Sequence, residues 1–171
     1  VISIRQVETP VPKDNEVLIR VHATTVNRTD CAMLRAKPFI MRFFTGLVKP
    51  KRKIPGTDFA GQVEAIGPNV ASLKIGDRVF GFSDAGVSSQ AQYMTFPDDK
   101  GISTIPRDFT FQQAAASLEG VHYGYNMINK VPLKAGQKAL VNGASGGIGS
   151  ATVQLLKYYG VHVTAVCNSK N

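Results

Sequence analysis

The segment that decides the fold is KALVNGASGGIGSATVQLLKYYGVHVTAV, which runs from Lys138 to Val166. Lys138 to Asn142 is typical of a short strand, Ile148 to Tyr159 of a helix, and Val161 to Val166 of a second strand. Four side chains of this helix recur at helical spacing on one stripe: Ile148, Thr152, Leu155 and Tyr159. A strand, a glycine-rich turn, a helix and a strand in this order predict one parallel βαβ unit.

The glycine-rich turn between the first strand and the helix has the residues that a phosphate-binding turn needs. Small residues let the backbone approach a pyrophosphate, and the free amides and dipole of the helix N-terminus favour its negative charge. Ala144 stands where the usual dinucleotide pattern has its first glycine, and Gly149 allows close packing of the helix. We expect a dinucleotide to bind this set: Ala144, Ser145, Gly146, Gly147, Ile148 and Gly149. The alternative is a tight turn that binds nothing.

The residues after the second strand bear on which dinucleotide binds. A site that prefers NAD places a carboxylate there, about 20 residues beyond the turn, to hold the ribose 2′-hydroxyl. This chain has Cys167, Asn168, Ser169 and Lys170 instead. Asn168 and Ser169 can donate hydrogen bonds and Lys170 supplies positive charge, so we expect NADP(H). The alternative for Lys170 is a solvent-exposed loop residue.

The chain before this unit predicts short strands separated by turns that contain Gly, Pro or Asn. Strands are expected at Glu16 to Thr25, Phe59 to Ile66, Arg78 to Phe80 and Ala91 to Phe96, with a strand-like segment at Val1 to Val7. A short helix is expected to follow Asn27–Asp30 and to run through Leu34. This spacing predicts a compact β-rich unit.

The pattern changes near Pro106. Thr110 and Gln113 form a capping-box pattern, and apolar residues then recur at helical spacing as far as Ile128, which predicts one helix. Gly120 and Gly124 either weaken this helix or let another element pack closely against it. We therefore place a β-rich domain at 1–112 and the start of a dinucleotide-binding domain at 113–171.

Composition limits the remaining possibilities. The chain has 171 residues, a formal net charge of +8 and two cysteines, which makes a disulfide framework or a four-cysteine zinc lobe improbable and fits a cytoplasmic setting. It has no apolar run long enough to cross a membrane. We expect it to be a fragment of a longer protein. Seven cations gather in one stretch: Arg35, Lys37, Arg42, Lys49, Lys51, Arg52 and Lys53. Either this stretch is a solvated loop, or its apolar residues cover a cleft or touch an anionic surface.

Three landmarks together resemble a known superfamily, the medium-chain dehydrogenases/reductases. The segment from Gly56 to Gly67 resembles its core signature, Lys74 to Gly81 its next landmark, and Gly143 to Gly149 its cofactor turn. The resemblance implies a mixed β and α/β fold, in which a GroES-like β-rich catalytic domain precedes the first part of a Rossmann domain. It also implies that the full-length protein is a homodimer and that the rest of the Rossmann sheet is absent from this chain.

Residue types at the superfamily's zinc positions decide the subgroup. This chain has Asn27 at the place of the first cysteine, Thr57-Asp58 at the place of a His-Glu pair, and Glu119 at the place of the third ligand. Because a neutral Asn is a poor zinc ligand, we expect no metal. The resemblance is therefore to the zinc-free quinone oxidoreductases, with enone reductases close by.

This resemblance implies NADPH-dependent hydride transfer to quinones or α,β-unsaturated carbonyls, which accept hydride without a metal. Asn27 resembles the family's Asn beside the nicotinamide, and it either donates a hydrogen bond to the substrate or caps the turn after the strand. Tyr123 stands where the family often has Thr, and it either donates a hydrogen bond or fills core space. Asp30 and Asp58 are expected to be structural acceptors.

Three other functions remain open at this point. The first is a non-catalytic NADPH-binding protein of the same fold, and the second is a zinc-dependent alcohol dehydrogenase. The third is nucleic-acid binding through the basic stretch, which charge alone supports weakly, because no recognised nucleic-acid motif is present. We therefore expect a small-molecule partner, no nucleic acid and no membrane span.

Overall fold

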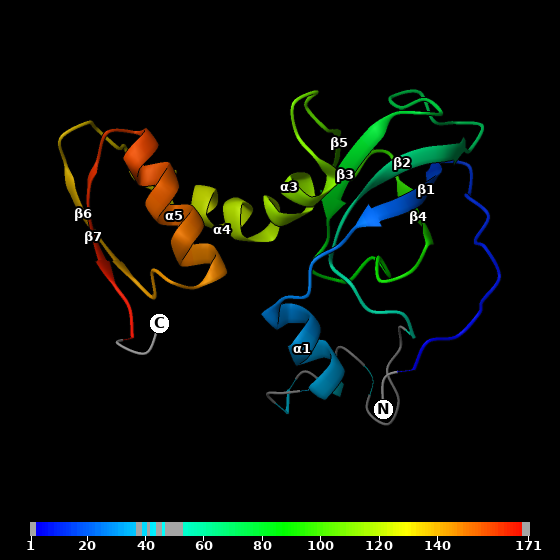
Figure 1. The fold of residues 1–171 in the computed structure, drawn as a ribbon, viewed down its shortest axis with the longest axis horizontal. Helices are drawn as coiled ribbons and strands as arrows, with labels where there is room; N and C mark the ends of the chain where they lie inside the picture. The colour runs from blue at the N-terminus through cyan, green and yellow to red at the C-terminus, as the bar shows by residue number, and fades with distance from the viewer. Residues whose placement is uncertain (1–2, 37–38, 41, 44–45, 47–52, 169–171) are drawn as a thin grey trace. The chain divides into compact units, whose positions relative to one another are not determined.

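A computed structural model describes residues 3–36, 39–40, 42–43, 46 and 53–168 of the chain (Figure 1). The chain divides into two compact units, Val1–Ala116 and Ser117–Asn171. Much of the basic stretch from Arg35 to Lys53 lies outside these described residues, and so do Ser169 and Lys170.

The first unit is built on one antiparallel sheet, as its short strands predict. Its strands are β1 (Glu16–Ala23), β2 (Asp58–Ile66), β3 (Arg78–Phe82), β4 (Tyr93–Pro97) and β5 (Ile102–Thr104), in the spatial order β4-β1-β2-β3-β5. β5 has only three residues and has no counterpart among the expected strands. The described part of the Val1–Val7 segment, from residue 3, has no strand, so that expectation is wrong there.

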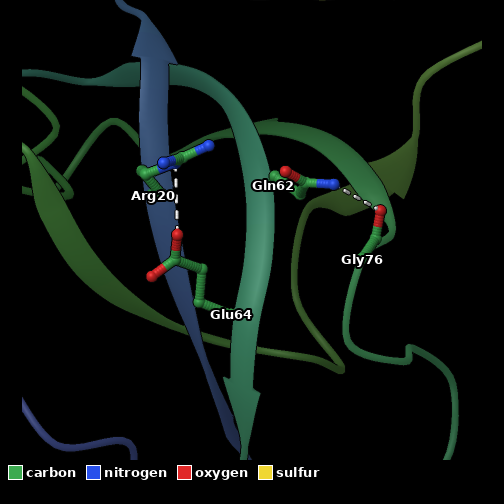
Figure 2. Close-up of polar contacts among 4 residues, drawn as sticks. All are labelled: Arg20, Gln62, Glu64 and Gly76. Carbon is green, nitrogen blue, oxygen red and sulfur yellow. Dashed lines mark hydrogen bonds and ion pairs between the residues drawn. The ribbon is translucent and has the colours of Figure 1, made fainter.

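Alternation of side chains explains which face of this sheet is buried. Val17 and Ile19 of β1 are completely buried, together with Phe59 of β2 and Val79 of β3. On the other face of β1, Arg20 forms an ion pair with Glu64 of β2 across 3.1 Å (Figure 2). Such an exposed pair contributes at most about 1 kcal/mol, so the buried face dominates the stability of the sheet.

Two helices belong to the first unit. α1 (Arg28–Arg35) confirms the short helix expected after Asn27. α3 (Phe111–Ala116) buries Ala114 and Ala115 in a small apolar cluster with Ala60 and Ile105, and its Phe111 ring stacks on His22 at 4.3 Å. These contacts hold α3 against the sheet, within the compact unit that ends at Ala116.

The single helix expected as far as Ile128 is two helices in the structure. α4 (Glu119–Ile128) follows α3 after a break at Ser117-Leu118, where Leu118 has φ −99° and ψ −89°. The break reflects a change of packing partner, because α3 packs on the first sheet whereas α4 packs on a helix of the second unit. Periodicity alone did not reveal it, since the apolar spacing continues through both helices.

The second unit confirms the expected parallel βαβ arrangement. β6 (Lys138–Asn142) pairs in parallel with β7 (His162–Val166), and α5 (Gly147–Tyr158) connects them. The buried residues of α5 are Ala151 and Leu156; of the expected stripe, Leu155 packs on the same apolar cluster as Leu156, whereas Ile148 is 38% exposed.

The glycines of α4 explain how that helix packs against α5. A Cβ on Gly120 would lie 2.8 Å from the Gly147 carbonyl oxygen, and one on Gly124 would lie 2.9 Å from Thr152 Oγ1. Only glycine permits this separation, so the close packing considered for Gly120 and Gly124 is what the structure has. The first turn of α4 consequently lies beside the start of α5.

Candidate functional site

The glycine-rich turn connects the end of β6 at Asn142 to the start of α5 at Gly147. Gly143 has φ +75°, a conformation that glycine adopts without strain. The amides of Gly143 and Ala144 both donate to the Val166 carbonyl, at 2.9 and 3.0 Å, which ties the turn to the end of β7. A Cβ on Gly149 would lie 2.1 Å from the Gly143 carbonyl oxygen, so only glycine allows α5 to begin this close to the turn.

The N-terminus of α5 has the properties of an anion site. Gly146 is its N-cap and has no side-chain cap hydrogen bond. The first amides of a helix have no acceptor within the helix, and they carry the positive end of its dipole. Ser145, Gly146, Gly147 and Ile148 are exposed, and among the described residues no atom lies within 4 Å of a Cβ built on Gly147. Side chains therefore leave this corner open to an anion.

Asn168 follows β7 at the carboxyl end of the two parallel strands, which is the end where the glycine-rich turn lies. Because the Val166 carbonyl accepts from Gly143 and Ala144, the chain after β7 starts next to the glycine-rich turn. Asn168 is exposed there. The other two residues expected to recognise a 2′-phosphate, Ser169 and Lys170, lie outside the described residues.

Asn27 lies in the first unit and is tightly held. It is the N-cap of α1, where its Oδ1 accepts from the Asp30 amide at 2.9 Å and its own amide donates to Asp30 Oδ2 at 3.0 Å. Its Nδ2 lies 2.7 Å from Thr57 Oγ1, 3.2 Å from Asp58 Oδ2 and 3.4 Å from Thr25 Oγ1. The capping role considered for Asn27 is therefore present in the structure.

The two aspartates beside Asn27 act as hydrogen-bond acceptors, as expected. Asp30 is 1% exposed, and its Oδ1 accepts from the Gly56 amide at 3.2 Å. Asp58 is 2% exposed, and its Oδ2 accepts from the Thr25 hydroxyl and from Asn27. These bonds offset the cost of burying two carboxylates, and they join α1 to the start of β2.

The side chains at two of the superfamily's zinc positions contact each other directly. Asn27 and Thr57 lie 30 residues apart in the sequence, yet an amide-to-hydroxyl hydrogen bond of 2.7 Å joins them. Among the described residues, no group of three or more His, Cys, Asp or Glu is placed to hold a metal ion. The donors at this point are an amide and a hydroxyl, which are weak ligands for zinc.

The sequence analysis missed a loop that lies beside this cluster. Residues 83–90 are tied to the segment before β2 by three backbone hydrogen bonds, from Ser83 to the Thr57 carbonyl, from Val87 to Gly56 and from Gln90 to Pro55, at 2.7–3.0 Å. The Gln90 side chain reaches the Thr25 carbonyl at 3.5 Å. No local motif marks these residues, because only the fold brings them to Thr25 and Thr57.

Tyr123 lies on α4 in the second unit, whose first turn is beside the glycine-rich turn. Its half-buried ring meets the His122 ring edge-on at a centroid distance of 5.6 Å. His122 in turn shares a 2.8 Å hydrogen bond with Asn126. The second unit thus contains Tyr123, the turn and Asn168, whereas the first unit contains Asn27 and its cluster.

Comparison with known proteins agrees with this architecture. The family model described as the alcohol dehydrogenase GroES-like domain matches residues 13–107, which is more than half of the chain and most of the first unit. The chain therefore belongs to the family of alcohol dehydrogenase GroES-like domains, here followed by part of a Rossmann unit.

Within that family the chain is similar to quinone oxidoreductases. It is 38% identical to the quinone oxidoreductase of Sus scrofa and 35% identical to that of Homo sapiens, each over 94% of this chain and 46% of the relative. The solved quinone oxidoreductase of Coxiella burnetii superposes with a TM-score of 0.85 at 27% identity, over 96% of this chain and 51% of that one. The chain spans about half the length of these relatives, and the expected resemblance is confirmed.

Among the helices of the described ranges, none is both long enough and apolar enough to span a bilayer.

Proposed function

We propose that the complete protein is an NADPH-dependent, zinc-independent oxidoreductase that transfers hydride to quinones or α,β-unsaturated carbonyls. The observation that carries the proposal is the open N-terminus of α5, which has an uncapped Gly146 and an exposed Gly147. Similarity to quinone oxidoreductases supports the same reading. A homodimer is part of the proposal, and the molar mass of the full-length protein in solution tests it.

The residues of the second unit would bind the cofactor. The turn from Ala144 to Gly149 would hold the pyrophosphate, chiefly with the Gly147 and Ile148 amides at the positive end of the α5 dipole, because the Ala144 and Gly146 amides already donate to backbone carbonyls. Asn168, together with Ser169 and Lys170, would contact the 2′-phosphate of NADPH, since Cys167 to Lys170 include no carboxylate to repel it. When bound, the nicotinamide supplies the hydride ion.

The residues of the first unit favour a substrate that accepts hydride without a Lewis acid. Asn27 and Thr57 contribute an amide and a hydroxyl at the zinc positions, and they are bonded to each other. Hydrogen-bond donors would then stabilise the negative charge that develops on the substrate oxygen. We propose that Tyr123 contacts the nicotinamide and substrate, and that Asn27 lies beside the nicotinamide and substrate while its polar atoms hold α1 in place.

Turnover by the full-length polypeptide tests this function. We expect oxidation of NADPH with small quinones or enones, and elemental analysis should find no stoichiometric zinc. NADPH binding without turnover across a broad panel of such substrates would instead support a non-catalytic NADPH-binding protein. One zinc per chain would support an alcohol dehydrogenase and would overturn the proposal.

A further inference from the structure

The carboxamide of Asn27 is one of the hydrogen-bond donors around Thr25. A carboxamide nitrogen carries two N–H groups. Asn27 Nδ2 already has three oxygen atoms within 3.4 Å, from Thr57, Asp58 and Thr25. Its Oδ1 is committed to the Asp30 amide. In this conformation the Asn27 carboxamide has no N–H group left for a substrate oxygen, because the protein's own acceptors outnumber its two hydrogens.

A second carboxamide, that of Gln90, also contacts Thr25. Gln90 Nε2 is 3.5 Å from the Thr25 carbonyl oxygen, which is the outer limit of a hydrogen bond. Within the described part of the chain, no other side-chain contact of the Gln90 carboxamide is within hydrogen-bond distance. Gln90 therefore has one weakly used N–H group, a second N–H group and a carbonyl oxygen.

The backbone holds Gln90 firmly although its side chain is weakly bonded. Its amide donates to the Pro55 carbonyl at 3.0 Å, and the preceding Ser89 is completely buried, with its hydroxyl 2.8 Å from Thr24 Oγ1. Ser88 has φ +63°, an uncommon conformation for a residue with a side chain. Strained residues of this kind persist where surrounding contacts impose them, and they gather at functional sites. The loop thus fixes the backbone of Gln90 while its half-buried side chain keeps donors to offer.

We propose that Gln90 donates a hydrogen bond to the carbonyl oxygen of the quinone or enone substrate. This inference rests on the proposed function. As an electron-poor carbon of the substrate gains a hydride ion, the electron pair of its π bond moves to the carbonyl oxygen. The Gln90 N–H group stabilises that anionic oxygen, and a proton from water completes the reduced product while NADPH becomes NADP⁺. Asn27 then holds the start of α1 and β2 together beside it.

A matched pair of variants of the full-length protein tests the assignment. Gln90→Leu removes the donor with little change in size, and Gln62→Leu is the control. Gln62 lies on β2 of the same unit and donates to the Gly76 carbonyl at 3.1 Å, as Figure 2 shows. We expect kcat/KM for the quinone or enone to fall about 100-fold in Gln90→Leu and to stay within about twofold in Gln62→Leu. The Kd for NADPH should stay unchanged in both variants, because the residues proposed to hold the phosphates of NADPH lie in the second unit.

A second substitution guards against a folding defect. Gln90→Glu keeps the shape of the side chain and removes its N–H donors, so it should lose activity as Gln90→Leu does. Full activity of Gln90→Glu, or equal activity of Gln90→Leu and Gln62→Leu in an active protein, would refute the Gln90 assignment and leave the proposed function standing. A wild-type protein with no reductase activity would refute the proposed function itself.

Discussion

Gly146→Asp should separate the stability of the second unit from its affinity for NADPH. Gly146 is the N-cap of α5 and has extended backbone angles, φ −78° and ψ 164°, which any residue can adopt. A Cβ there would lie 3.4 Å from the Gly143 carbonyl oxygen, which is an ordinary contact. Asp is a favoured N-cap residue, and a negative charge at a helix N-terminus adds stability. We expect the free energy of unfolding to rise by roughly 0.5–1 kcal/mol.

The carboxylate that Gly146→Asp introduces should repel a phosphate bound at the first amides of α5 and so weaken the binding of NADPH. Two like charges about 4 Å apart repel by about 4 kcal/mol at an effective dielectric constant of about 20. That energy corresponds to a Kd for NADPH raised about 1000-fold. Calorimetric titration of the full-length protein with NADPH, beside thermal unfolding of the cofactor-free protein, measures both effects.

Two controls accompany this variant. Gly146→Ser supplies a neutral N-cap and should weaken binding much less than Gly146→Asp. Gln154→Glu makes the same change of charge further along α5, at an exposed position that no cofactor contact is proposed for. If Gly146→Asp bound NADPH within about threefold of wild type, or Gln154→Glu weakened binding as much, the phosphate would not lie at this turn.

Three further substitutions probe the rest of the structure. Asn27→Ala removes the α1 cap and leaves Thr57 without its amide partner, so denaturant unfolding should show a loss of about 1–3 kcal/mol; unchanged stability would contradict the capping geometry. Gly124→Ala places a Cβ 2.9 Å from Thr152 Oγ1, so the Tm should fall by several degrees, and an unchanged Tm would show that α4 and α5 are not this close. Asn168→Asp should lower the ratio of NADPH to NADH affinity about tenfold or more, because it adds a charge that repels the 2′-phosphate, and equal cofactor affinities in the wild type would refute the proposed preference.

Local sequence patterns were enough for the elements whose formation depends on neighbouring residues. The βαβ order of the second unit follows from apolar periodicity and from the glycines of the turn. Gly149 illustrates the reason, since its lack of a Cβ is required within the turn itself, 2.1 Å from the Gly143 carbonyl oxygen. The α1 N-cap at Asn27 also depends on a partner only three residues away, Asp30, although the helix was expected to begin after Asp30.

Local patterns failed where the packing partner decides the structure. The apolar spacing continues from Phe111 to Ile128, but the chain breaks at Leu118 because α3 and α4 pack on different elements. The stripe expected on α5 likewise did not say what each residue would meet: Thr152 faces Gly124 of α4, whereas Leu155 packs on the apolar core with Val141. Periodicity identifies a helix, but it does not say which of two neighbours its apolar residues will meet.

The amino-acid sequence by itself determined the glycine-rich turn and the two kinds of unit, because both depend on residues close together in the chain. Only the tertiary structure decided the neighbours of Thr25, where Asn27 is saturated by acceptors and Gln90 is weakly bonded. Gln90 lies 65 residues from Thr25, and Thr57 lies 30 residues from Asn27. Sheet pairing brings such residues together, and hydrogen-bond geometry then determines which donors remain for a substrate.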